Sequence, residues 1–270
     1  MKPFLFSSLL IFGGVYAVMA GWLYFNQRGI LYIPYTAQPS PAEAGLPDME
    51  VVEYQTAGGL TLYGWYQQAQ GDKPTIVYFH GNAGNLLNHS WIAGPLIEAG
   101  YGVLLVEYRG YGGNPGKPTE DGLYADGRAA IEFLKGAGIN ENGLVFFGQS
   151  LGTGIAVKMA IEYSPKALIL QSPYTSIAKA GQHHYWYLPV LWLIKDKFPS
   201  DERIGDVAAP LLVLIAERDT IIPPKMSRQL FALANQPKTL KALADTGHND
   251  LSSNGGIKAV LEFLSKLQII

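Results

Sequence analysis

The chain has 270 residues, of which 48% are hydrophobic and 16% charged; this composition suits one large folded domain and excludes a disordered chain. With 20 basic and 22 acidic residues the net charge is −2, so the sequence gives no reason to expect nucleic acid as a partner. The chain has no cysteine, which excludes a disulfide framework, a thiolate zinc site and a cysteine nucleophile.

The N-terminus carries a long uncharged run. No charged residue lies between Lys2 and Arg28, and the 23 residues at 3–25 are mostly apolar. A helix of this length spans a hydrocarbon core of about 30 Å, so residues 1–27 are predicted to form a single-pass membrane anchor in contact with lipid. A signal peptide cut before Gly21 is the alternative. The side of the membrane stays open, with an extracytoplasmic domain favoured by analogy.

The pattern changes after a proline-containing stretch at 28–48, which is predicted to be a linker. Apolar runs at 49–56 and 60–67, joined by a glycine turn, predict an antiparallel hairpin. Five later runs lack polar alternation, as is typical of strands buried on both faces of a parallel sheet. Helices are expected between or after these runs at 86–99, 121–136, 151–163, 224–235 and 256–267. Residues 49–270 are therefore predicted to form a doubly wound α/β domain, mostly parallel with antiparallel N-terminal strands.

A G-x-S-x-G motif at 148–152 lies between a predicted strand and a predicted helix. In this context the motif is typical of a nucleophile elbow, in which a tight turn presents the Ser150 hydroxyl and requires small neighbours. A plain flexible loop is the structural alternative. Serine needs an imidazole base and an orienting carboxylate to act as a nucleophile at neutral pH.

The acid and the base are sought after Ser150, in the order serine, acid, histidine. Asp219 directly follows a buried run and is the predicted acid. Glu217 is more simply explained as one half of a solvated charge pair with the adjacent Arg218. His248 lies on the loop before the last helix and is the predicted base. Loop residues Asp245 and Asp250 are less suitable acids. Of the other histidines, His80 and His89 precede the serine, and His183 and His184 precede the acid, so their order in the chain is wrong. The adjacent pair at 183–184 also lacks the spacing typical of a metal site.

Two backbone amides are predicted to stabilise the oxyanion. One belongs to Leu151, the residue after the nucleophile, and the other to Asn82, in the loop after the third apolar run. This glycine-containing loop lacks the G-x-x-x-x-G-K-[ST] and G-x-G-x-x-G patterns of phosphate-binding loops. A similar stretch at 110–117 has the wrong spacing. No nucleotide, other cofactor or metal is expected.

Several ordered motifs together resemble the serine hydrolases of the α/β-hydrolase fold: HGNAGN, VEYRGYGGNPGKPTEDGLYADGRAA, FFGQSLGTGIAV, AERDTIIPP and TGHNDL. The likeness runs from about residue 24 to the C-terminus and is greatest to a small membrane-anchored branch that includes protein depalmitoylases. It implies a triad of Ser150, Asp219 and His248. Asn114 stands where that branch often has serine, which affects only the details of its loop.

Residues 174–205 form the longest insertion and contain a dense group of aromatic and aliphatic side chains, so a short lid over the site is expected. Such a patch suits an acyl chain or a membrane surface, although part of it simply covers the sheet. The sequence thus predicts a serine hydrolase of acyl esters or thioesters. A peptidase or amidase, or a non-catalytic anchored binding protein, are the alternatives. Deleting residues 1–25 is expected to leave turnover of small soluble esters within a few-fold.

Overall fold

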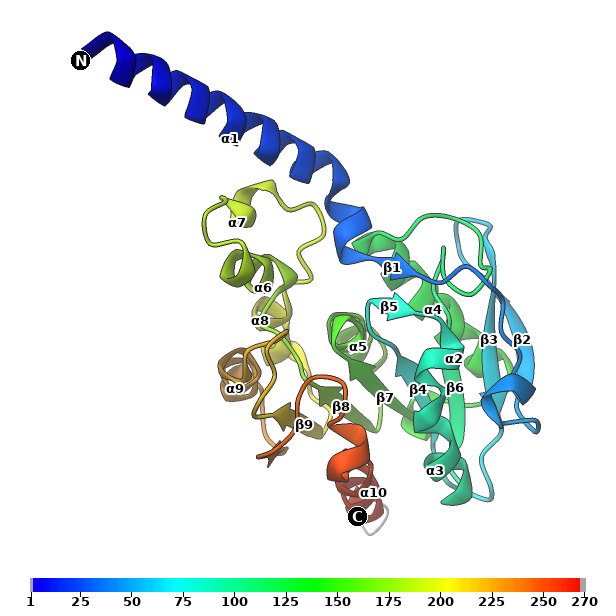
Figure 1. The fold of residues 1–270 in the computed structure, drawn as a ribbon. Coiled ribbons are helices and arrows are strands. Elements are labelled where there is room, and N and C mark those ends of the chain that lie inside the picture. Colours follow the sequence, from blue (N-terminus) through cyan, green and yellow to red (C-terminus); the bar gives the residue numbers. More distant parts are fainter. Residues whose placement is uncertain (1, 268–270) are drawn as a thin grey trace.

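An eight-stranded sheet forms the centre of the protein in a computed structural model, which describes the backbone of residues 2–267 and the side chains of residues 10–267 (Figure 1). The strand order is β10-β9-β8-β7-β4-β6-β3-β2; β2 and β3 are antiparallel, β3 is antiparallel to β6, and the other pairs are parallel. The strands are β2 (Glu50–Gln55), β3 (Thr61–Gln67), β4 (Thr75–Phe79), β6 (Gly102–Val106), β7 (Leu144–Gln149), β8 (Ala167–Gln171), β9 (Leu211–Ala216) and β10 (Lys238–Leu243). The predicted mostly parallel sheet with an antiparallel start is confirmed.

The central strands are buried on both faces, which explains their lack of polar alternation. In β4, Val77 and Phe79 belong to one hydrophobic core, whereas Ile76 and Tyr78 belong to the other. Successive side chains of a strand point to opposite faces, so each central strand contributes to both cores. Helices on the two faces complete these cores: α4 (Glu120–Gly136), α5 (Leu151–Tyr163) and α9 (Pro224–Leu233) on one, α3 (Ala93–Glu98) and α10 (Ile257–Leu267) on the other.

The helix expected at 86–99 is divided into shorter pieces. It consists of α2 (Leu86–His89), a 3₁₀ turn at Ser90–Ile92 and α3. Pro95 has no amide hydrogen to donate to the carbonyl of Trp91, so a continuous helix would lose a bond there. The other predicted helices agree with the structure to within a few residues.

The N-terminal helix α1 (Lys2–Leu31) projects from the domain, and only its C-terminal part lies beside it (Figure 1). The predicted anchor begins in residues 1–9, whose side chains lie outside those that the structure describes. Within the described residues, no helix combines the length and the apolar character needed to cross a membrane.

Part of the predicted linker at 28–48 is held against the domain. Strand β1 (Ile33–Pro34) pairs in parallel with β5 (Ala83–Gly84), and the Ile33 amide donates to the Asn82 carbonyl at 2.9 Å. Tyr32 is buried against the core. The loop after β4 offers backbone groups to this segment, so the first part of the predicted linker is hydrogen-bonded to the domain.

The 174–205 segment forms three short helices, α6 (Ile177–His184), α7 (Val190–Leu193) and α8 (Ser200–Arg203). Its apolar side chains divide between two environments: Leu188 is buried, whereas Trp186 and Trp192 are 78% and 87% exposed. Figure 1 shows α7 near the C-terminal part of α1, away from the sheet.

Candidate active site

Ser150 lies at a strained corner between β7 and α5. Its backbone has φ 50° and ψ −117°, a conformation that side-chain-bearing residues rarely adopt, and its amide donates to the Gln171 carbonyl at 2.9 Å. The two motif glycines have no room for a side chain. A Cβ on Gly148 would lie 2.6 Å from the Gly152 carbonyl oxygen, and one on Gly152 would overlap the Phe79 carbonyl. Strand, turn and helix therefore meet as closely as a nucleophile elbow requires.

The structure brings Ser150, His248 and Asp219 into one hydrogen-bonded chain. His248 Nε2 lies 3.0 Å from Ser150 Oγ, and His248 Nδ1 lies 2.7 Å from Asp219 Oδ2. The other carboxylate oxygen of Asp219 accepts from the amides of Ile221 and Ile222 at 2.9 and 2.8 Å. This geometry allows the imidazole to accept a proton from the hydroxyl while the carboxylate fixes its orientation.

The environment of Asp219 favours its ionised form. Burial raises the pKa of this carboxyl, but the hydrogen bond and charge of His248, together with the amides of Ile222 and Ile221, outweigh burial and leave the pKa below its ordinary value. The carboxylate is therefore charged throughout the neutral range and can stabilise a protonated His248.

The alternative acids occupy other places. Glu217 pairs with Arg228, not with Arg218 as its neighbourhood in the sequence indicates. Arg218 instead pairs with exposed Asp245 at 2.6 Å. Asp250 accepts from the Gly247 amide at 2.6 Å, and so it holds the loop just before His248.

The loop after β4 is held firmly next to Ser150. The Asn82 carbonyl accepts from the Tyr111 hydroxyl at 2.7 Å as well as from Ile33, and the Asn82 side chain donates to the Leu31 carbonyl at 2.9 Å. A Cβ on Gly81 would lie 3.7 Å from Ser150 Cβ. The two residues predicted to donate to the oxyanion, Asn82 and Leu151, line the same cavity as the serine.

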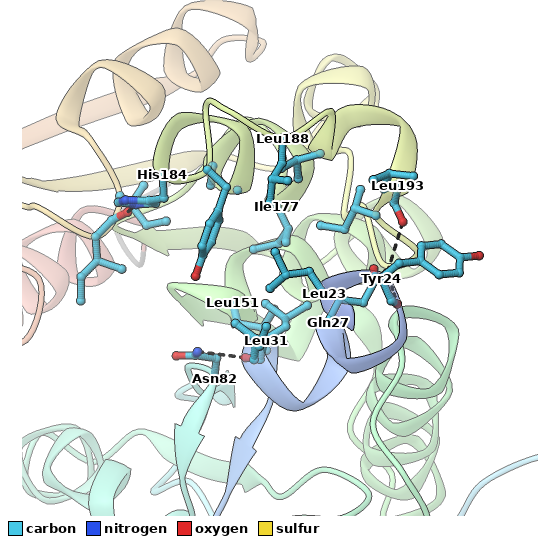
Figure 2. A pocket seen from close by; sticks show the side chains of 18 of the residues that line it. Leu23, Tyr24, Gln27, Leu31, Asn82, Leu151, Ile177, His184, Leu188 and Leu193 are labelled. Carbon is cyan, nitrogen blue, oxygen red and sulfur yellow. Dashed lines mark hydrogen bonds between the residues drawn. The ribbon is translucent and has the colours of Figure 1, made fainter. Parts of the chain in front are cut away.

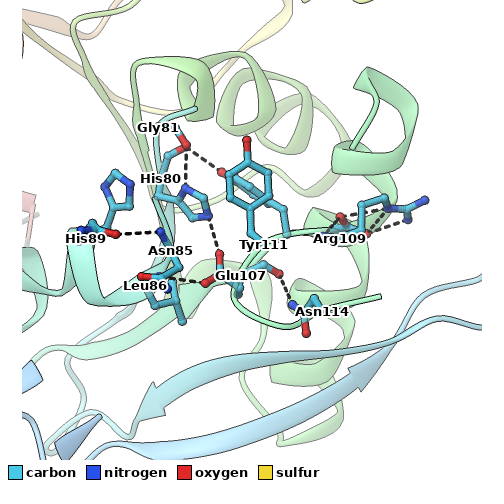
Figure 3. A network of polar contacts seen from close by, with 12 residues as sticks. His80, Gly81, Asn85, Leu86, His89, Glu107, Arg109, Tyr111 and Asn114 are labelled. Carbon is cyan, nitrogen blue, oxygen red and sulfur yellow. Dashed lines mark hydrogen bonds and ion pairs between the residues drawn. The ribbon is translucent and has the colours of Figure 1, made fainter. Parts of the chain in front are cut away.

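A buried polar network below this loop was not predicted from the sequence (Figure 3). His80 Nε2 lies 3.0 Å from Glu107 Oε1, and His80 Nδ1 lies 2.7 Å from the Gly81 carbonyl. The second Glu107 oxygen accepts from the Leu86 amide at 2.9 Å. Both side chains are almost fully buried, so the pair connects the ends of β4 and β6 and fixes the start of the Asn82 loop.

A signal for this network is present in the sequence. His80 follows β4 and Glu107 follows β6, two strands that pair in parallel and end at the same edge of the sheet. Asn114 extends the contacts, since its side chain accepts from the Tyr63 amide at 2.8 Å and donates to the Glu107 carbonyl at 3.1 Å. The amide side chain thereby ties its loop to β3.

A cavity of about 240 Å³ opens next to Ser150 (Figure 2). Leu151 and Asn82 line it together with the serine, and its remaining walls are mostly aliphatic. They come from the end of α1, from the 174–205 segment and from the loop after Asp219: Ala20, Leu23, Tyr24, Gln27, Ile30, Leu31, Ile177, Ala180, Gly181, His184, Tyr185, Leu188, Val190, Leu193, Ile194, Ile221 and Ile222.

Two of the remaining histidines hydrogen-bond to backbone carbonyls. His89 Nε2 lies 2.8 Å from the Ala83 carbonyl, and His184 Nε2 lies 2.7 Å from the Ile221 carbonyl. Across the part of the chain that the structure describes, no three histidine, aspartate or glutamate side chains gather in a way that could hold a metal ion.

Comparisons with known proteins find several similar sequences. A family model described as serine aminopeptidase, S33, matches residues 70–202. An uncharacterized protein of Mycobacterium tuberculosis strain H37Rv is 38% identical over 92% of this chain and 91% of its own length. The lysophosphatidylserine lipase ABHD12 of Danio rerio is 34% identical over 65% of this chain, which spans about half of that lipase.

Solved structures show the same fold. The esterase Pf2001 of Pyrococcus furiosus superposes with a TM-score of 0.71 and 19% identity, covering 87% of this chain and 98% of the esterase. An α/β sheet of this order, a strained serine elbow and these relatives lead to the same assignment. The chain therefore has the α/β-hydrolase fold and belongs to the same family as the uncharacterized Mycobacterium tuberculosis protein.

Proposed function

We propose that the protein hydrolyses carboxylic esters or thioesters of acyl chains through a covalent acyl-enzyme on Ser150. The observation that carries the proposal is that Ser150 Oγ lies 3.0 Å from His248 Nε2 and faces an aliphatic cavity. A nucleophile beside an apolar pocket suits a substrate whose acyl carbonyl is followed by a hydrocarbon chain.

In the proposed mechanism, His248 takes the Ser150 proton as the hydroxyl attacks the acyl carbon. Asp219 stabilises the imidazolium, and the amides of Leu151 and Asn82 hold the oxyanion. His248 then gives the proton to the leaving alcohol or thiol. Water, activated by the same imidazole, attacks the acyl-enzyme and releases the carboxylic acid and free Ser150. None of these steps calls for a metal or an organic cofactor.

Lipid-derived esters are the favoured substrates. Two similar proteins are a lysophosphatidylserine lipase and an esterase, which supports ester cleavage. Thioesters remain in the proposed class because the sequence motifs resemble those of depalmitoylases. The 174–205 segment would act as a short lid, since α6 and α7 contribute much of the cavity wall.

A peptidase is the second candidate, favoured by the description of the matching family model. An aminopeptidase must hold a substrate ammonium group, for which a carboxylate is the ordinary partner. Among the described residues that line the cavity there is no Asp or Glu. The lining therefore favours acyl esters over peptides.

We also propose that the N-terminal segment holds the enzyme at a membrane. The described part of α1 supports this, because Ile11, Phe12 and Val18 are 66%, 72% and 75% exposed to solvent. Sedimentation of the full-length protein with membranes tests the proposal, and intact-mass analysis shows whether the chain begins at Met1. A soluble mature chain that begins at Gly21 would contradict a retained anchor.

Turnover of p-nitrophenyl esters, compared with that of peptide p-nitroanilides, tests the proposed function. We expect ester cleavage that Ser150→Ala lowers by about 10⁴–10⁶-fold, because the acyl-enzyme route is lost. Ser265→Ala, which removes an exposed hydroxyl from α10, is the matched control and should retain full activity. Faster cleavage of the anilides, or substantial ester turnover by folded Ser150→Ala, would contradict the proposal.

A further inference from the structure

One face of α1 forms part of the cavity beside Ser150. Ala20, Leu23, Gln27 and Ile30 all line the cavity and recur at spacings of three and four residues. Residues at these spacings lie on the same side of a helix. In Figure 2 Leu23 approaches the cavity from α1, and Leu188 approaches it from the segment after α6.

Polar contacts hold α1 in this position. Arg28 forms two bonds with the Asp196 carboxylate, at 2.8 and 3.1 Å. Gln27 donates to the Leu193 carbonyl at 3.2 Å and accepts from the Lys195 amide at 2.7 Å. Together these contacts fix the last turns of α1 against the segment that carries α6 and α7.

A second set of contacts connects α1 to the rest of the molecule. The Tyr16 hydroxyl donates to the Tyr187 carbonyl at 2.9 Å, about one turn before the first cavity residue, Ala20. At the helix end, the Asn82 side chain donates to the Leu31 carbonyl at 2.9 Å. One helix is thus bound both to the 174–205 segment and to the loop that carries a proposed oxyanion donor. A flexible tether would not need these contacts.

The size and lining of the cavity suit a single hydrocarbon chain. Its volume of about 240 Å³ is below the range of about 300–1,000 Å³ typical of pockets for drug-sized ligands, so it suits a narrow ligand such as one hydrocarbon chain. The described lining includes no Asp, Glu, Lys or Arg. Burial of methylene groups against these aliphatic walls is favourable, and the walls provide no group that could pair with a charged head group.

We propose that α1 is one wall of the acyl-chain site, so that the chain of a monoacyl substrate lies between α1 and the α6–α7 segment while its carbonyl carbon meets Ser150. This inference rests on the proposed function. It makes the N-terminal helix a determinant of chain-length specificity in addition to any role at the membrane. Leu23 is the α1 side chain most suited to report on it, because it is only partly exposed and lies in the cavity wall.

Protection of an introduced cysteine from maleimide labelling tests the proposal. The natural chain has no cysteine, so no other thiol is labelled. Leu23→Cys is treated first with a fluorophosphonate carrying a methyl or a dodecyl chain and then with N-ethylmaleimide. In the first reaction Ser150 Oγ bonds to phosphorus, fluoride leaves, and His248 takes the proton. Val18→Cys, on an exposed face of the same helix, is the matched control, and Ala20→Cys gives a second reading on the cavity face.

The dodecyl adduct should slow maleimide labelling of Cys at position 23 by at least about tenfold relative to the methyl adduct, because the alkyl chain shields the thiol. Labelling at position 18 should be the same in both adducts. Equal labelling at positions 20 and 23 in both adducts, with the adducts present by intact mass, would overturn the α1 wall and leave the proposed function standing. Absence of either adduct from folded protein would overturn the proposed function itself, and with it this inference.

Discussion

Deleting residues 1–25 removes Ala20, Leu23 and Tyr24 from the cavity wall and leaves Ser150, Asp219 and His248 in place. If these side chains cover part of a bound acyl chain, the deletion should weaken selection for long chains and spare short ones. Turnover of an acetyl ester is expected to stay within a few-fold of the full-length value.

The size of the effect follows from the cavity lining. Decanoyl esters have eight more methylenes than acetyl esters, and each buried methylene contributes about 0.8 kcal/mol to binding. The three deleted residues are about a seventh of the 20 that line the cavity. The deletion should therefore remove about 1 kcal/mol of the preference for decanoyl over acetyl, which is about fivefold in the ratio of the two kcat/KM values.

The assay measures kcat/KM for p-nitrophenyl acetate and decanoate below their micelle concentrations, with active sites counted by a methyl fluorophosphonate. Val18→Ala in the full-length chain removes an exposed side chain from α1 and should keep the wild-type ratio. A deleted protein with full active-site content and an unchanged decanoyl-to-acetyl ratio would refute the reasoning.

Three further outcomes are expected. Gly152→Ala should destabilise the fold by about 3 kcal/mol in urea unfolding, because the new methyl overlaps the Phe79 carbonyl; wild-type stability would contradict the tight elbow. Arg28→Ala leaves the nearly buried Asp196 carboxylate without its cation, and since Arg28 is half exposed we expect a loss of about 1 kcal/mol. Thermal unfolding measures this loss, and Arg28→Lys should restore part of it. The lowered pKa of Asp219 stabilises the folded state above the ordinary carboxyl pKa of about 3.9, and this contribution is lost as the pH falls through the folded value. The Tm of the wild type should therefore decline more steeply than that of Asp219→Asn as the pH is lowered from 5 to 3, and parallel declines would contradict the assignment.

The proximity of the proposed catalytic residues could be predicted from the sequence. Ser150, Asp219 and His248 each follow a strand, β7, β9 and β10, and parallel strands end at the same edge of a sheet. Because these strands are buried on both faces, they could be recognised in the sequence as apolar runs. The local chemistry of the elbow, with its two glycines, fixed the serine independently of the rest.

The position of α1 could not be predicted in the same way. An apolar helix face has the same composition whether it meets lipid, a lid or a substrate chain, so the run at 3–25 gave no sign of the cavity wall. The contacts that fix it, such as Arg28 with Asp196, join residues 168 apart in the sequence. For a similar reason residues 28–48 resembled a linker: the two-residue pairing of β1 with β5 is too short to produce a pattern.

The central claim is that Ser150 is a nucleophile activated by His248. Peptide mapping by mass spectrometry after treatment with a fluorophosphonate tests it most directly, with the rate of labelling compared between wild type and His248→Ala. We expect one adduct per chain, on Ser150, formed at least about a hundredfold more slowly without the imidazole, because the hydroxyl then lacks its base. An adduct on another residue, or labelling of Ser150 at the same rate in His248→Ala, would contradict the account.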